Sequence, residues 1–213
     1  MTTRHRLILL AMLSAIPMAA SSQVALDCRM APGTLCAEQN LAGRDLRGVD
    51  LSHANFYATD LTGANLAGVQ MTESRLKETI LDRADLRGAK LTGADLTRAS
   101  LAQARLDQAD LNDANLKGVR ARGASFTAAS LAGAEMFGAG LTRATLDRAD
   151  LRRANLRAAD LDGANLRGAD LRGAKLQNAD LRGADLRDAR IDAGTDFSGA
   201  RMEHCLACPS SRP

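Results

Sequence analysis

The segment Ala164-Asn165-Leu166-Arg167-Gly168-Ala169-Asp170-Leu171-Arg172-Gly173 contains one five-residue unit twice, and the unit returns at Ala179-Asp180-Leu181-Arg182-Gly183. The period extends outward over most of the 213 residues. From Leu41 to Ile191 the residue at every fifth position is apolar, with 25 Leu, two Phe, two Met, one Ile and one Ala. Two residues before each of these 31 positions lies a second periodic position, which is Ala at 23 of them.

A period of five fits neither the 3.6 residues of an α-helical turn nor the two-residue alternation of a strand. The chain must therefore turn a corner once in every repeat, and the stacked turns form a solenoid. In a unit such as Ala-Asp-Leu-Arg-Gly, successive side chains alternate between inside and outside, as on a strand. Gly suits the corner, where a positive φ is needed.

These units resemble the A(D/N)LXX unit of the pentapeptide-repeat family, over about Cys36 to Met202. The resemblance implies an all-β fold, a right-handed quadrilateral β-helix with four pentapeptides to a coil and the Ala and Leu side chains inside. About eight coils are then expected, with every twentieth residue in one column. The predicted core ladder of one such column contains Leu61, Leu81, Leu101, Leu141, Leu161 and Leu181.

The first 22 residues have the pattern of a secretory signal peptide. Arg4 and Arg6 precede an apolar run, Leu7 to Met18, and small residues follow at 19–22. The run is shorter than the ~20 residues of a membrane-spanning helix, so cleavage before Gln23 is favoured over an uncleaved anchor. We therefore predict a periplasmic or secreted protein without stable membrane insertion. The expected organisation is signal peptide 1–22, N-terminal cap 23–35, solenoid 36–202 and C-terminal tail 203–213.

The four cysteines lie in two pairs at opposite ends of the solenoid. Cys28 and Cys36 flank its first coil, and Cys205 and Cys208 follow its last. In an oxidising compartment this favours two local disulfides, and the separation of the pairs argues against one four-cysteine zinc site. The alternative is thiol redox chemistry at the Cys205-Leu206-Ala207-Cys208 motif, although the sequence context of a thioredoxin-like fold is missing.

Surface charge bears on the possible partners. We counted the charges at the two outward positions of each strand. The net charge is −2 on the face carrying Leu61, 0 on the face carrying Leu46, −1 on the face carrying Leu51 and +3 on the fourth face. The whole chain has +3, or +1 once Arg4 and Arg6 are removed with the signal. Some family members protect gyrase by resembling the dense negative charge of DNA. Because Arg alternates with Asp here, neither a DNA mimic nor a nucleic-acid partner is favoured.

The fourth face combines this positive surplus with two outward aromatic residues. Aromatic and Arg side chains are typical anchors of protein interfaces. The face is therefore the candidate binding surface, and its predicted residues are Tyr57, Arg75, Lys77, Lys117, Phe137, Arg157 and Lys175.

No catalytic residue, metal ligand or cofactor is predicted. His53 and His204 fall at opposite ends of the rod, and the carboxylates recur with the repeat, so no placed acid/base pair stands out. The sequence thus predicts a non-enzymatic, exported scaffold or protein-binding rod whose partner is an unidentified protein or envelope component. A redox protein and a topoisomerase-protecting DNA mimic are the alternatives. A homodimer through the C-terminal end is also expected, because the short tail leaves Phe197, Met202 and Leu206 incompletely covered.

Overall fold

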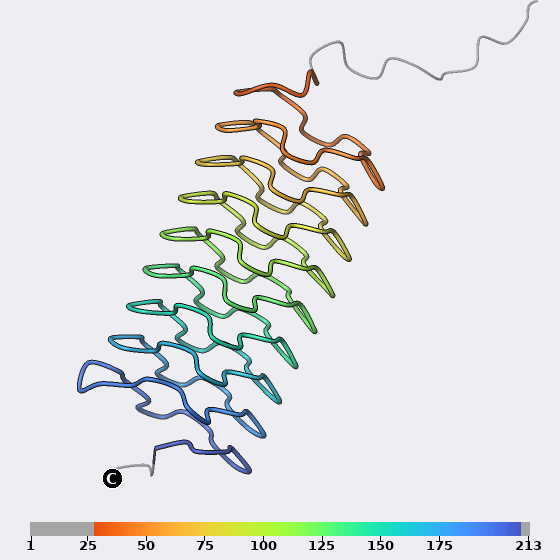
Figure 1. Cartoon of the computed structure of the whole chain (residues 1–213). Helices are drawn as coiled ribbons and strands as arrows, with labels where there is room; N and C mark the ends of the chain where they lie inside the picture. Colours follow the sequence, from red (N-terminus) through yellow and green to blue (C-terminus); the bar gives the residue numbers. More distant parts are fainter. Residues whose placement is uncertain (1–27, 210–213) are drawn as a thin grey trace, which may run out of the picture.

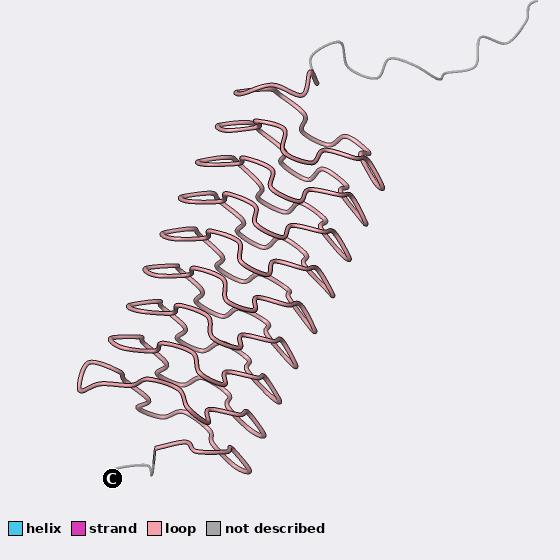
Figure 2. Cartoon of the chain, viewed as in Figure 1, coloured by secondary structure: helices cyan, strands magenta, loops and turns pink. Residues whose placement is uncertain are grey.

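The computed structural model describes residues 28–209, and the predicted signal peptide therefore lies outside the described residues. The described chain winds into one rod of stacked turns that runs from its N-terminal to its C-terminal end (Figure 1). Within 28–209 there is neither a helix nor an extended strand, and Figure 2 draws this whole stretch as loop. Its regular structure consists of isolated parallel β-bridges, one in each pentapeptide.

The bridges fix the register of the solenoid. They join residues 20 apart, from Leu35 with Asn55 to Asp170 with Arg190, so that four pentapeptides complete one coil. After Ile191 the spacing becomes 21, beginning with Lys175 and Asp196. One extra residue, at Ala193-Gly194, accounts for this shift of the register.

Backbone hydrogen bonds join each repeat to the coils on both sides. The Leu101 N–H donates to the Arg120 carbonyl at 2.7 Å, and the Arg120 N–H donates to the Ala99 carbonyl at 3.0 Å. The corner is closed within the repeat, because the Ala104 N–H donates to the Leu101 carbonyl at 3.0 Å. The same three bonds recur along the regular coils, so they supply partners for the backbone groups that the stacking buries.

The corners require a left-handed backbone whether or not Gly is present. The residue two positions after the central Leu has a φ of 63° at Gly63, but also 54° at Glu73 and 54° at Ala128. We expected Gly to supply these corners, yet many carry other side chains. The hydrogen-bonded turn imposes this conformation, at a cost of about 1–2 kcal/mol for a residue with a Cβ atom.

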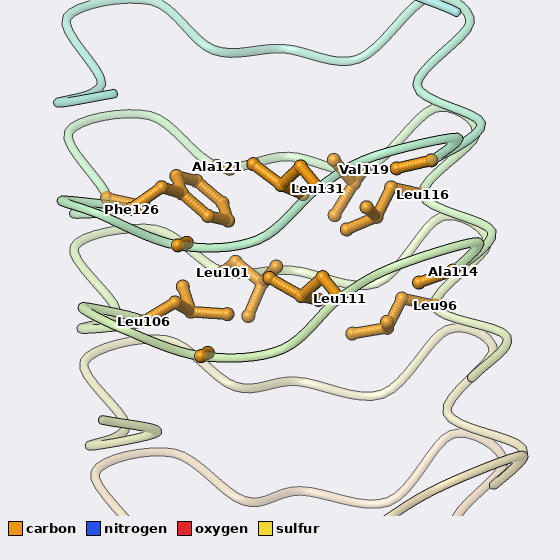
Figure 3. Close-up of a cluster of buried hydrophobic side chains, with 14 of the residues drawn as sticks. Leu96, Leu101, Leu106, Leu111, Ala114, Leu116, Val119, Ala121, Phe126 and Leu131 are labelled. Carbon is orange, nitrogen blue, oxygen red and sulfur yellow. The ribbon is translucent and has the colours of Figure 1, made fainter. Parts of the chain in front are cut away.

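The core is a narrow column of Leu and Ala side chains. The six predicted ladder residues of the Leu61 column are fully buried: Leu61, Leu81, Leu101, Leu141, Leu161 and Leu181. Ala121 interrupts this column, and in Figure 3 the Phe126 ring extends into the interior of the same coil. Arg120 still bridges to Gly140, so the ladder continues without a break. The irregular coil is therefore explained by volume compensation rather than by a groove.

The C-terminal end differs from the regular ladder. Ile191 has an inward position in the repeat, but 45% of its surface is exposed because no further coil among residues 28–209 covers it. Phe197 and Met202 are partly buried against the core. Leu206 is 48% exposed and bridges to Asp185, so it occupies an outward position rather than the open end where we expected it.

On the surface of the rod, the Asp and Arg side chains of single Asp-Leu-Arg triplets form ion pairs with each other. The Arg152 guanidinium binds Asp150 through Nε at 2.8 Å and Nη2 at 2.6 Å. Arg187 binds Asp185 in the same way. Other pairs connect neighbouring coils, as between Arg190 and Asp170 at 3.5 Å. Exposed pairs of this kind each contribute about 0–1 kcal/mol to the stability of the fold. Their main effect is therefore to neutralise charge on the surface.

The left-handed corners predict that Ala128→Gly stabilises the protein. Ala128 has a φ of 54°, and Gly adopts this conformation without the Cβ penalty, so the free energy of unfolding should rise by about 1 kcal/mol. The control is Ala129→Gly at the neighbouring buried position, which should lower it. Urea denaturation measures both, and a loss of stability in Ala128→Gly would contradict the strain assigned to the corner.

The Asp185–Arg187 pair predicts a loss of stability in acid. Hydrogen bonding from Arg187 lowers the pKa of Asp185 to about 2, from ~3.9 in the unfolded chain. The depressed pKa means that the pair stabilises the fold above about pH 4 and that this contribution disappears as the pH falls through about 2. The free energy of unfolding, measured by denaturation between about pH 4 and about pH 2, should differ between wild type and Asp185→Asn near pH 4, and this difference should shrink as the pH falls. A difference between them that does not vary with pH would refute this linkage.

Candidate functional site

The candidate surface, called the basic face here, is the side of the rod whose repeats are centred on Phe56, Leu76, Leu96, Leu116, Met136, Leu156 and Leu176. One outward column follows the bridges from Asn55 through Arg75 to Lys175. The second column lies two residues later in each repeat. The structure places all seven predicted residues on this face with exposed side chains: Tyr57, Arg75, Lys77, Lys117, Phe137, Arg157 and Lys175.

The two aromatic residues do not form one cluster. Tyr57 and Phe137 occupy the same position four coils apart, or about 19 Å at 4.8 Å per coil. The Tyr57 hydroxyl donates to Glu78 Oε2 at 3.2 Å. The negative charge of Glu78 raises the pKa of Tyr57, and this hydrogen bond raises it further. Phe137 is the more exposed of the two, at 52% against 37%.

Corner residues neutralise the N-terminal half of the basic face, which we define as its repeats from Phe56 to Leu96. Glu73 and Glu78 lie at the corners on either side of Arg75 and Lys77. Glu73 also contacts His53 Nδ1 at 3.4 Å. Our sequence count of two outward positions per strand missed these side chains. The period itself could have located them, because each corner follows a central apolar residue by two positions.

The C-terminal half of the basic face, with repeats from Leu116 to Leu176, keeps a positive surplus. Its cations are Lys117, Arg153, Arg157 and Lys175, and its acidic residues are Glu135 and, at the corner before Leu116, Asp113. Glu135 is shared, since Lys117 Nζ lies 3.6 Å from Oε2 and Asn155 Nδ2 donates to the same oxygen at 2.9 Å. Arg153, at the corner, was not among the predicted residues.

Arg157 differs from the paired arginines of the other faces. Asn155 stands where an Asp-Leu-Arg triplet would have Asp, and its Oδ1 accepts the Arg157 backbone N–H at 3.4 Å. The Arg157 guanidinium instead donates through Nε to Gln177 Oε1 at 3.0 Å. Both partners are uncharged, so the positive charge of Arg157 is not neutralised within its own strand.

Hollows in the described part of the chain include one at the C-terminal end of the rod and one on its side. A hollow of about 700 Å³ opens at the C-terminal end, where its apolar walls include Ile191, Phe197, Met202 and Pro209. A shallower one of about 430 Å³ lies over Gly168. In its rim Arg148 pairs with Asp147 at 2.8 Å and Arg167 with Asp188 at 3.1 Å, so its charges are mutually compensated.

The cysteines pair within each end of the rod. The Cys28 and Cys36 Cα atoms are 4.8 Å apart and those of Cys205 and Cys208 are 5.7 Å apart, with a disulfide in each pair. Among residues 28–209, no group of three or more His, Cys, Asp or Glu side chains is placed to hold a metal ion. Over the same range, no helix is long and apolar enough to cross a membrane.

The family model for pentapeptide repeats (8 copies) matches residues 40–77, 79–118, 114–153 and 149–188. Among solved structures, HetL, a pentapeptide repeat protein involved in heterocyst differentiation regulation from the cyanobacterium Nostoc sp. strain PCC 7120, is 30% identical. That match covers 82% of this chain and 85% of HetL, with a TM-score of 0.47. QnrB1, a plasmid-mediated fluoroquinolone resistance protein, is 21% identical over 79% of this chain and 92% of QnrB1, with a TM-score of 0.61.

A search of curated proteins finds no match. The likeness to QnrB1 concerns the fold alone, and the solved relatives imply a right-handed quadrilateral β-helix. The repeat model covers well over half of the chain and agrees with the 20-residue register of the bridges. The chain therefore belongs to the pentapeptide-repeat family.

Proposed function

We propose that this chain is an exported, non-enzymatic rod that binds a protein or another component of the bacterial envelope through its basic face. Members of the pentapeptide-repeat family are generally non-enzymatic. One observation carries the proposal: Phe137 is 52% exposed on a face where no carboxylate within the strand neutralises Arg157. Exposed aromatic and Arg side chains are the groups that most often anchor protein interfaces.

The rod geometry supports a scaffold role. The bridges hold successive coils in one register, so that side chains on one face keep fixed spacings of about 4.8 Å along the axis. Such a surface is already ordered before a partner binds. Binding then costs little additional conformational entropy, which favours recognition by a rigid face.

The two alternatives fit the surface less well. A DNA mimic needs a negative charge density near that of duplex DNA, one charge per ~1.7 Å of axis. Here carboxylates such as Asp150 and Asp185 are bound by Arg152 and Arg187. Against redox chemistry, Cys205 and Cys208 are partly buried against the core and joined by a disulfide, which supports a structural staple.

Crosslinked pull-down of the tagged full chain from its own envelope tests this function. We expect one specific partner, which is lost with either Arg75→Glu/Lys77→Glu or Lys117→Glu/Arg157→Glu. The matched control is Lys90→Glu/Arg122→Glu, the same charge change on other faces, and it should retain the partner. N-terminal sequencing of the same material should begin at Gln23. Capture that survives both basic-face variants, or a cytoplasmic chain that begins at Met1, would refute the proposal.

We also propose that the C-terminal end joins two copies of the chain. The hollow there exposes Ile191, Phe197 and Met202, and among the described residues their backbone N–H groups have no hydrogen-bond partner. In the preceding coil, the equivalent Leu171 N–H donates to the Arg190 carbonyl at 2.8 Å. Open strand edges around an apolar hollow favour pairing with another chain, and a two-fold interface uses the same patch on both copies.

Light scattering of the full chain at micromolar concentration tests the dimer. The native protein should have twice the monomer mass, and Ile191→Asp should be monomeric, because a charge would enter an apolar contact. Ile191 is already 45% exposed, so the monomer should still fold. Ile80→Asp is the matched control, since Ile80 is 39% exposed but lies far from this end. A native monomer, or a dimer unaffected by Ile191→Asp, would reject this interface.

A further inference from the structure

An exposed ring stands between two cations in the C-terminal half of the basic face. Lys117, Phe137 and Arg157 hold the same position in successive coils, because their neighbours Asn115, Glu135 and Asn155 bridge in that order. Adjacent members of this column are thus about 4.8 Å apart along the axis, and the two cations about 10 Å apart. Phe137 is 52% exposed at the centre.

Two more cations extend the patch toward the C-terminal end. Lys175 follows Asn155 in the bridge column, and Arg153 lies at the adjoining corner. Both side chains are exposed, and neither forms an ion pair with any of the residues that the structure describes. The patch therefore has an apolar centre with positive groups above, below and to one side.

We propose that this half of the basic face binds an extended acidic segment of a partner protein, with an apolar side chain placed on Phe137 between two carboxylates. The proposal rests on the function proposed above and names the chemistry of its partner. Alternate side chains of an extended peptide point to one face, with about 6.6 Å between them. Two carboxylates four residues apart, with the apolar residue midway, therefore lie about 13 Å apart on one face, which the long side chains of Lys117 and Arg157 can reach. A further carboxylate reaches Lys175 or Arg153.

The acidic residue inside the patch favours discrete carboxylates over a continuous anionic surface. Glu135 is bridged between Asn115 and Asn155, directly beside Phe137. A lipid bilayer or a nucleic-acid backbone laid on Phe137 would bring phosphates close to this carboxylate, and like charges repel. A peptide can place an uncharged residue opposite Glu135 and keep its acids for Lys117 and Arg157.

The inference is tested with the full chain and a labelled peptide, acetyl-Ser-Glu-Ser-Leu-Ser-Glu-Ser-Glu-amide, by fluorescence anisotropy. Lys117→Glu/Arg157→Glu should weaken binding at least about tenfold, and Phe137→Ser should weaken it about three- to tenfold. The matched control is Lys90→Glu/Arg122→Glu, the same charge change on other faces of the rod, and it should bind as wild type does. A peptide with the same composition but Leu moved to one end should bind more weakly.

Other results would overturn the inference or separate it from the proposed function. Equal loss in the Lys90/Arg122 control, no peptide binding at all, or preferential binding of phosphatidylglycerol vesicles through the same residues would overturn the inference. If the envelope partner is lost with Arg75→Glu/Lys77→Glu but kept with Lys117→Glu/Arg157→Glu, the proposed function survives and this inference fails. If no specific envelope partner exists, the proposed function fails, whereas the peptide measurement reports on the patch alone.

Discussion

The structure depends on one hydrogen-bonded corner that recurs every five residues. The N–H of the small inward residue donates to the carbonyl of the preceding Leu, as from Ala104 to Leu101 at 3.0 Å, while the residue just before the small one, here Gln103, is forced into a positive φ. This turn brings the chain back into register with the coil before it. Without it neither the Leu column nor the bridges could form, because both require an identical bend in every repeat.

A repeated corner also separates the inside of the rod from its outside. The central Leu and the small residue are committed to the core, and three of the five positions remain free for surface chemistry. Any outward substitution then appears at a fixed place on one of four faces. The contrast between Asp150 and Asn155 illustrates this: the first neutralises Arg152, and the second leaves Arg157 charged. Replacing one carboxylate with an amide therefore changes the net charge on part of one face without affecting the buried column of Leu side chains.

The sequence alone predicts the features that follow from the period. The buried Leu column, the one-residue shift at Ala193-Gly194 and the local position of each cysteine pair could all be read from spacing. The exposure of Ile191 could not, because it depends on which coil is last rather than on the repeat. The charge balance of the candidate site was also misjudged, since Glu73 and Glu78 act from corners outside the strand positions that were counted. Tyr57 and Phe137 share a face, but only the structure separates a Tyr bound to Glu78 from a free ring.

The two halves of the basic face differ in net charge because each charged side chain is neutralised only by groups in its own coil or the next one. Charges on a solenoid interact mainly with the next coil, since two coils already separate them by about 10 Å, the Debye length near 0.1 M salt. Glu73 and Glu78 therefore screen Arg75 and Lys77, but they have little influence on Arg157 or Lys175 farther along the rod. A face with a modest overall surplus can thus carry a concentrated positive patch at one end. For a rod of this kind, the meaningful electrostatic unit is a window of two or three coils, and within such a window two cations flank the exposed ring of Phe137.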